Sequence, residues 1–262
     1  MKKVNFLLAV FFIRHIIYPL FTSIIWREKM LKKIAILITF LFFILSCKGK
    51  SENSILLTYK FQQGVKFVST VNSIVKVPTK PAPVHFQFDF ETEYKEVLDN
   101  GNKVKLHYKY LSFTSNGKKT TPNFPVLEFF LYKNGKADIQ SGPLKDYQST
   151  IIFSDERVDI GDTWKTYLTV PVQEARYNCN VTAKFEKLVT HRNKKAAYIR
   201  YSGTKEDITI NNVPHKVSVS GDMYFDLETG MYLNFTAQYK YFKKTGDNWN
   251  ETMTVDVTTA LQ

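Results

Sequence analysis

The sequence predicts a mainly β fold: one large curved antiparallel sheet of about 11 strands, arranged as a half-barrel or a sandwich. Two observations indicate this class. From Ile55 onward, apolar and polar residues alternate with a period of two, as in strands that have one dry face. Turn signals such as Asn100-Gly101 separate the alternating runs. We expect at most one short helix in this region and a hydrophobic helical leader before it.

The leader is clearest at residues 30–47, MLKKIAILITFLFFILSC. Lys32 and Lys33 form the short cationic start that signal peptides require. The apolar segment from Ile34 to Leu45 has twelve residues. As a helix it would rise about 18 Å, whereas the hydrocarbon core of a bilayer is roughly 30 Å thick. The segment therefore fits a signal-peptide core better than a permanent membrane span.

The end of this segment, Ile44-Leu45-Ser46-Cys47, resembles the lipobox of bacterial lipoproteins. The resemblance implies that residues 30–47 are a lipoprotein signal peptide and that Cys47 becomes the lipidated N-terminus, with acyl chains of the palmitate class. It also implies a lipid-anchored protein of the bacterial cell envelope. The outer membrane is the expected membrane, and its periplasmic or surface side stays open. The alternatives are a plain secretory leader and an uncleaved anchor.

Three further segments complete the predicted organisation. Residues 1–29 contain a second apolar stretch, broken by Arg14, His15 and Pro19. We interpret residues 1–29 as an upstream overrun or hydrophobic extension, with Met30 as the natural start; the alternative is an N-terminal membrane hairpin. Residues 48–54 form a short polar tether. Residues 55–262 form the antiparallel β domain.

The charge and the cysteines exclude some classes of protein. The chain has 36 Lys and Arg against 24 Asp and Glu, and a net charge of +12. After Cys47 no run of Lys or Arg is longer than two residues, which indicates a solvated face and no nucleic-acid partner. If Cys47 is acylated, Cys179, the second of two cysteines, has no disulfide partner. Its place in an alternating run predicts an inward-facing thiol.

Two hairpins and one helix are expected in the first half of the β domain. Residues 86–94 and 104–110 alternate around the Asp99-Asn100-Gly101 turn, which predicts a long antiparallel hairpin. A second hairpin is expected around Lys133-Asn134-Gly135. Residues 141–150, in which Gly142-Pro143 precedes LKDYQS, are the best place for one short helix.

The second half repeats some features of the first. Its alternating runs start at Trp164, Tyr177, Ala197, Val213, Met231 and Met253. In both halves an aromatic residue stands three positions after a glycine, as in Gly64 with Phe67 and Gly161 with Trp164. This weak repeat predicts two similar halves within one sheet.

No catalytic signature is visible. The sequence has no P-loop, dinucleotide fingerprint or G-x-S-x-G elbow. The five histidines lack the spacing of a metal site, and neither cysteine belongs to a C-x-x-C pair. Asp159, Asp162, Asp226 and Glu228 fall in turn signals, where carboxylates bond to the backbone. We therefore expect no enzyme activity, metal or cofactor; a hydrolase that uses the turn acids is a third, minor hypothesis.

Aromatic residues are the strongest remaining signal, with 21 Phe, 15 Tyr and 3 Trp. The inward face of the predicted sheet carries rings that could surround a hydrophobic ligand: Phe88, Phe90, Tyr94, Trp164, Phe185, Phe225, Phe235 and Tyr239. The same rings could instead fill their own core. The sequence alone favours the filled core.

Two motifs carry a wider resemblance. V-x-I-G-D-T-W at residues 158–164 and F-D-x-x-T-G at residues 225–230 resemble uncharacterised bacterial lipoproteins, and more distantly the lipoprotein-carrier (LolA-like) superfamily. That superfamily folds a curved sheet around a lipid-binding cavity. The resemblance implies a non-enzymatic envelope lipoprotein that binds a hydrophobic or lipid ligand, although this sequence lacks the helices that plug the carriers' half-barrel. The alternative is a surface-exposed, adhesin-like or structural protein that interacts through its charged outer face.

Overall fold

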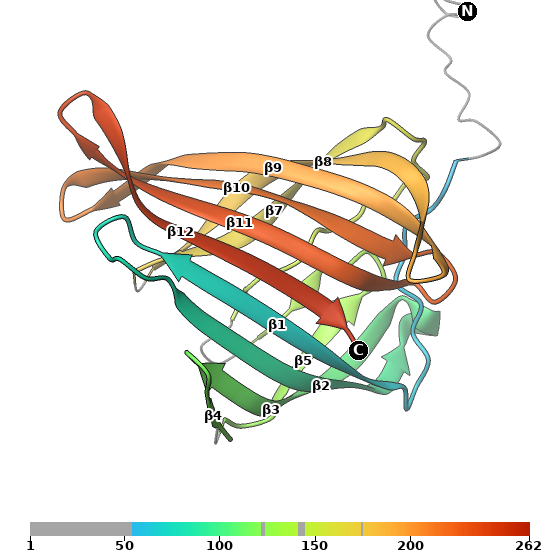
Figure 1. The fold of residues 1–262 in the computed structure, drawn as a ribbon. Helices are drawn as coiled ribbons and strands as arrows, with labels where there is room; N and C mark the ends of the chain where they lie inside the picture. Colours follow the sequence, from blue (N-terminus) through green and yellow to red (C-terminus); the bar gives the residue numbers. More distant parts are fainter. Residues whose placement is uncertain (1–53, 122–123, 141–144, 174) are drawn as a thin grey trace, which may run out of the picture. The chain divides into compact units, whose positions relative to one another are not determined.

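Twelve antiparallel strands form one curved sheet in the computed structural model, which describes residues 54–121, 124–140, 145–173 and 175–262 (Figure 1). The first six are β1 (Lys66–Lys76), β2 (Val84–Leu98), β3 (Lys103–Ser115), β4 (Lys118–Thr120), β5 (Leu127–Tyr132) and β6 (Ala137–Asp138). The others are β7 (Thr163–Val172), β8 (Ala175–His191), β9 (Lys194–Ile210), β10 (Val213–Asp226), β11 (Met231–Thr245) and β12 (Asn248–Leu261). The single sheet agrees with the predicted half-barrel and not with a sandwich.

The predicted leader, Cys47 and the tether up to residue 53 lie outside the described residues. Ser54, the last residue of the predicted tether, is buried, and its hydroxyl accepts a hydrogen bond from Arg157. Ser54 is therefore packed as part of the β domain.

The strand order is β6-β5-β3-β2-β1-β12-β11-β10-β9-β8-β7, and β4 pairs only with β3 beside this path. One meander runs outward from β1 to β6, and a second runs inward from β7 to β12. The two meanders join where β1 pairs with β12, with Val71 opposite Thr259. The described sheet therefore has β6 and β7 at its two edges. The similarity of the two halves stays a prediction.

Both predicted hairpins of the first half are confirmed. Strands β2 and β3 pair from Leu98 opposite Lys103 outward, around a short 3₁₀ turn at Asp99–Gly101. Asn100 and Gly101 have φ values of 54° and 87°, which these two residue types tolerate better than others. The second hairpin joins β5 to β6, where Gly135 N–H donates to the Tyr132 carbonyl at 2.8 Å.

The predicted helix at residues 141–150 is not formed in the part that the structure describes. Residues 145 and 146 make a turn, residues 147–149 have no regular structure, and Asp146 has a φ of 59°, which no α-helix accommodates. Within the described ranges the chain has no α-helix, and no helix there is long and apolar enough to span a membrane.

Residues 145–153, here called the strap, connect the two edges of the sheet. The buried residue Gln148 forms most of this connection. Its backbone N–H donates to Thr169 Oγ1 at 2.9 Å and its carbonyl accepts from Thr169 N–H at 2.8 Å, both on β7. Its side-chain Oε1 accepts from Ala137 N–H on β6 at 2.9 Å, and its Nε2 donates to the Gly135 carbonyl at 3.0 Å. Gln148 thus bonds to both edges of the sheet, to β7 through its backbone and to the β5–β6 hairpin through its side chain.

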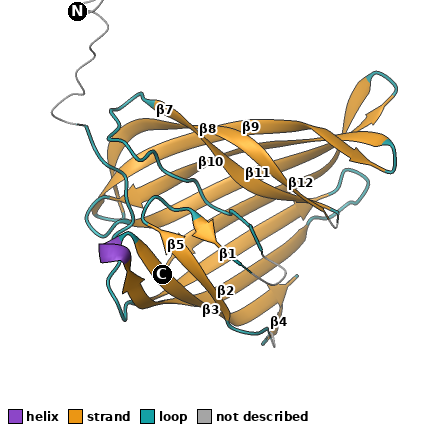
Figure 2. Cartoon of the chain, turned by 180° about the vertical axis from the view of Figure 1, so that it is seen from behind, coloured by secondary structure: helices purple, strands orange, loops and turns teal. Residues whose placement is uncertain are grey.

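The strap and residues 54–61 cover one part of the inner face of the sheet, and Figure 2 shows such loops crossing it. Leu57 and Ile151 from these segments are almost fully buried. The ring of Tyr59 packs against Phe153 and Phe225, with centroids 5.7 and 5.3 Å apart. These residues belong to one cluster with the inward side chains of β7 to β11, including Leu168, Val181, Phe185, Ile199, Tyr201 and Met223. The inner face over β7–β10 is therefore a filled core.

Candidate functional site

The other part of the inner face is open. A cavity of about 630 Å³ lies between β1, β2, β3, β11, β12 and the strap, within the range of roughly 300–1,000 Å³ that is usual for small-molecule sites. It is lined by Tyr59, Phe67, Val71, Val75, Phe90, Thr92, Tyr94, Leu106, Tyr108, Phe129, Leu131, Ala137, Tyr147, Ser149, Thr150, Pro171, Gln173, Met231, Tyr232, Phe235, Tyr239, Tyr241, Met253, Val255, Val257 and Thr259.

The strand alternation creates this lining. Every second residue points to the same face of a strand, so the lining residues recur at even spacing along β1, β2 and β12. On β12 they run from Met253 to Thr259, about 20 Å at the usual rise per residue. On β11 they run from Met231 to Tyr241. The cavity is therefore elongated along the strands.

The lining contains no Lys, Arg, His, Asp or Glu among the described residues. Charges of the same strands lie on the outer face, where Lys66 Nζ is 3.5 Å from Glu93 and Lys105 Nζ is 2.8 Å from Glu128. Glu93 of β2 thus pairs with β1, and Glu128 of β5 pairs with β3. An uncharged interior favours apolar or neutral polar ligands, because an unpaired charge would lose its hydration there.

Seven tyrosines supply most of the polar atoms of the lining. Burial raises the pKa of Tyr59, Tyr94 and Tyr108 above the ordinary value, and the proximity of Tyr232 raises each further. Burial also raises the pKa of Tyr239 and Tyr241, and Tyr147 adds to both shifts. All these phenols therefore stay protonated at physiological pH and can donate hydrogen bonds.

The cavity tyrosines lie in two groups. Tyr59, Tyr94 and Tyr108 lie near Tyr232, and Tyr239 and Tyr241 lie near Tyr147. Tyr232 and Tyr239 are seven residues apart on β11, or about 23 Å along an extended strand. The cavity thus has one group of hydrogen-bond donors toward each end.

Two of these hydroxyls are paired within the protein and five are not. Tyr232 bonds with Ser69 Oγ at 3.3 Å and Tyr59 bonds with Thr150. Tyr94, Tyr108, Tyr147, Tyr239 and Tyr241 make no hydroxyl bond to another described residue. In the described ranges the fully buried side-chain atoms without partners are His191 Nε2 and Asn234 Oδ1. The five tyrosine hydroxyls are therefore in contact with open space.

The structure separates the eight aromatic residues that the sequence predicts to face a ligand. Phe90, Tyr94, Phe235 and Tyr239 line the cavity. Phe185 and Phe225 are 1% exposed and belong to the filled core. Trp164 donates its indole N–H to the Ile152 carbonyl of the strap at 2.8 Å. Phe88 packs on Phe113, with ring centroids 4.8 Å apart. These last four do not line the cavity.

Sequence reasoning missed other lining residues. The cavity is also lined by Phe67, Val71 and Val75 on β1 and by Val255 and Val257 on β12. Their alternation in the sequence could have marked them as inward-facing residues. The contribution of β1 and β12 depends on their pairing, which joins the first and last strands of the domain. The strap residues Tyr147, Ser149 and Thr150 also line the cavity, but no periodicity marks them.

Comparisons with known proteins give only distant similarity. No protein-family model matches the chain, and no curated protein matches it significantly. One similar solved structure is described as "lipid-protein interactions in lipovitellin", with 9% identity and a TM-score of 0.44 over 77% of this chain and 25% of that chain. Another is a putative outer membrane lipoprotein-sorting protein domain from Vibrio parahaemolyticus, with 10% identity and a TM-score of 0.19 over 75% of this chain and 84% of that one. This chain spans a quarter of the lipovitellin chain.

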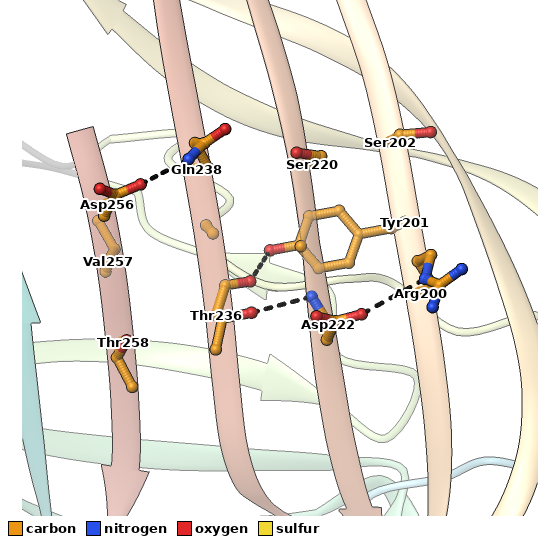
Figure 3. Close-up of a pocket in the computed structure, with 12 residues that line it drawn as sticks. Arg200, Tyr201, Ser202, Ser220, Asp222, Thr236, Gln238, Asp256, Val257 and Thr258 are labelled. Atoms are coloured by element: carbon orange, nitrogen blue, oxygen red, sulfur yellow. Dashed lines mark hydrogen bonds and ion pairs between the residues drawn. The ribbon is translucent and has the colours of Figure 1, made fainter. Parts of the chain in front are cut away.

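A second hollow, of about 430 Å³, lies over β9–β12 (Figure 3). Its charged and amide side chains are already paired within the protein. Arg200 Nε lies 3.6 Å from Asp222, Thr236 Oγ1 accepts from Asp222 N–H, and Gln238 donates to Asp256 at 2.8 Å. Because these charged and amide groups are engaged within the protein, the aromatic cavity is the better candidate site.

Asp226 and Cys179, two other candidate reactive groups among the described residues, have structural roles. Asp226 is fully buried in a turn, where Lys194, Thr229 and the Glu228 N–H donate to it. Cys179 is fully buried, and burial raises the pKa of its thiol to about 11, so it is a packed and unreactive side chain. No cluster of three or more His, Cys, Asp or Glu in the described ranges could hold a metal ion.

Proposed function

We propose that this protein is a membrane-anchored lipoprotein of the bacterial cell envelope that binds a hydrophobic ligand in the cavity between β1–β3 and β11–β12, without catalysing a reaction. The observation that carries the proposal is the 630 Å³ cavity with its aromatic and aliphatic lining. A ligand that fills such a cavity gains about 25 cal/mol for each Å² of apolar surface removed from water.

Anchoring belongs to the same proposal. The lipobox-like residues 44–47 would place two acyl chains on Cys47, and each buried CH₂ contributes about 0.8 kcal/mol to membrane attachment. A protein held at a membrane has direct access to lipids, which agrees with a lipid ligand. We therefore propose a role in holding or transferring lipid at the envelope.

The test uses the uncharged fluorophore N-phenyl-1-naphthylamine and two variants of β1. Val71 lines the cavity, whereas Asn72 is exposed on the opposite face. Val71→Trp fills part of the cavity, and Asn72→Trp adds the same ring outside it. We expect probe fluorescence to rise with the wild type and with Asn72→Trp, and to be much weaker with Val71→Trp.

A fold control accompanies this experiment. Val255→Phe also reduces the cavity with a smaller increase in volume, and circular dichroism shows whether each variant retains its β structure. Unchanged probe binding in both folded cavity variants would contradict the proposed site.

A further inference from the structure

The chemistry of the lining narrows the class of ligand, and this inference rests on the proposed function. We propose that the cavity selects an uncharged acyl ester, the class that includes mono- and diacylglycerols, with its ester and hydroxyl oxygens accepting hydrogen bonds from the cavity tyrosines.

An uncharged lining disfavours an ionised ligand. Within the described residues the lining offers no cation to a carboxylate or phosphate and no anion to an amine. An ionised headgroup inside would lose its hydration without a partner, which costs several kcal/mol or forces it to become neutral. The nearby cation is Arg176, which is exposed and stacks on the Tyr147 ring at 5.6 Å. It is not part of the lining.

The cavity tyrosines can donate hydrogen bonds to a ligand. The hydroxyls of Tyr94, Tyr108, Tyr147, Tyr239 and Tyr241 face open space and have no partner among the described residues. A pure hydrocarbon would cover these donors without bonding to them, which costs free energy for each covered group. An ester accepts such bonds through its carbonyl oxygen, and a glyceryl group adds further oxygens.

The elongated shape of the cavity fits a long acyl chain. The lining extends about 20 Å along β12 from Met253 to Thr259. Between Tyr232 and Tyr239 on β11 lies Phe235, and Val257 of β12 pairs with Ala237 in the same section; Phe235 and Val257 offer only apolar contacts. A long acyl chain with oxygens at one end matches an apolar middle section that is bounded by hydrogen-bond donors.

The test compares three probes that share a long chain: 1-oleoylglycerol, oleate and 1-octadecene. Binding of each to the purified full-length protein, freed of bound lipid, is measured at pH 8 by competition with N-phenyl-1-naphthylamine. Oleate has a charged carboxylate in place of the glyceryl ester of 1-oleoylglycerol, and octadecene has no oxygen. We expect 1-oleoylglycerol to bind at least about tenfold more tightly than oleate, and more tightly than octadecene.

Two tyrosine variants test the hydrogen bonds. Tyr108→Phe and Tyr241→Phe each remove one hydroxyl and keep the ring, and they lie in different tyrosine groups. Each should weaken binding of 1-oleoylglycerol by about threefold to tenfold and leave octadecene unchanged. Tyr224→Phe is the matched control, because Tyr224 stacks on His191 and does not line the cavity.

The outcomes separate this inference from the proposed function. If none of the three probes binds, both proposals fail. If octadecene or oleate binds as tightly as 1-oleoylglycerol, or if the Phe variants affect all probes equally, the inference on ligand class is wrong while the hydrophobic site stands. Tight oleate binding that Arg176→Gln abolishes would show capture of a carboxylate at Arg176 and would also overturn it.

Discussion

Cys47 is the residue on which membrane anchoring depends in this account. Substitution Cys47→Ser removes the sulfur that a lipobox resemblance marks for acylation, so we expect the variant to lose labelling by palmitate and to leave the membrane fraction or stay unprocessed. Metabolic labelling and cell fractionation measure this. Cys179→Ser is the control, because Cys179 is buried within the sheet and should not affect labelling. Unchanged labelling of the Cys47→Ser variant would refute the assignment.

Asp226 is a buried carboxylate whose charge stabilises a turn. Burial alone raises its pKa, but hydrogen bonds from Thr229, Lys194 and the Glu228 N–H outweigh burial and leave the pKa below the ordinary value. Because the folded pKa lies below the unfolded value of about 3.9, this stabilisation is present above that pH and is lost as the pH falls through the folded pKa.

The Asp226→Asn variant tests this stabilisation. We expect it to lower the free energy of unfolding by about 1–3 kcal/mol at pH 7, because it disturbs a buried set of hydrogen bonds. The difference from wild type should shrink at acidic pH, as urea denaturation at several pH values would show. Asp207→Asn is the control, because the Asp207 side chain is 80% exposed. A difference that grows toward low pH would contradict the assignment.

At the scale of one strand pair, Gly221 is required by close packing. A Cβ at this position would lie 2.0 Å from the Thr236 carbonyl oxygen and 2.4 Å from the Tyr201 hydroxyl. The Tyr201 hydroxyl reaches across to donate to the same carbonyl, and Figure 3 shows this bond. Gly221 thus leaves room for the Tyr201 ring between β9 and β11.

We expect Gly221→Ala to lower the free energy of unfolding by about 1–3 kcal/mol, because the added methyl group overpacks this contact. Thermal unfolding measures the effect. Ser220→Ala, on the other face of the same strand, should stay within about 0.5 kcal/mol of wild type. Equal free energies of unfolding for the two variants would show that the sheet can accommodate a Cβ at position 221, and would contradict the requirement for glycine there.

The strap is the element that connects the two sheet edges, and it depends on Gln148. Replacing Gln148 with alanine leaves the Ala137 N–H and the Gly135 carbonyl without their side-chain partners. Such losses cost about 1–3 kcal/mol for each buried group. Hydrogen exchange should become faster at Ala137 and Thr169, while the amides of β9–β11 serve as the internal control. Equal exchange at Ala137 and Thr169 in variant and wild type would show that Gln148 does not hold the edges together.

For the whole domain, alternation predicted most strands and their inward faces. The alternation correctly predicted the β2–β3 hairpin and the inward position of Cys179, because both depend on residues close together in the sequence. It could not assign the rings to core or cavity. Phe185 and Phe225 are buried because residues 54–61 and the strap pack over them, and these contacts join distant parts of the chain.

The predicted helix failed for a related reason. Its sequence satisfies helix rules locally, but Gln148 makes its hydrogen bonds with both sheet edges, which an α-helix would not allow. The strap therefore shows tertiary contacts overriding local preference. The same override places Tyr147 at the cavity.

We propose that the part of the inner face between β1–β3 and β11–β12 holds a hydrophobic ligand, while protein fills the rest. A mass spectrum of the organic extract from full-length protein purified without detergent tests it most directly. We expect lipid in stoichiometric amount from the wild type and from Asn72→Trp, and much less from Val71→Trp. No lipid in the wild-type extract, together with a crystal structure in which side chains fill the cavity, would contradict it.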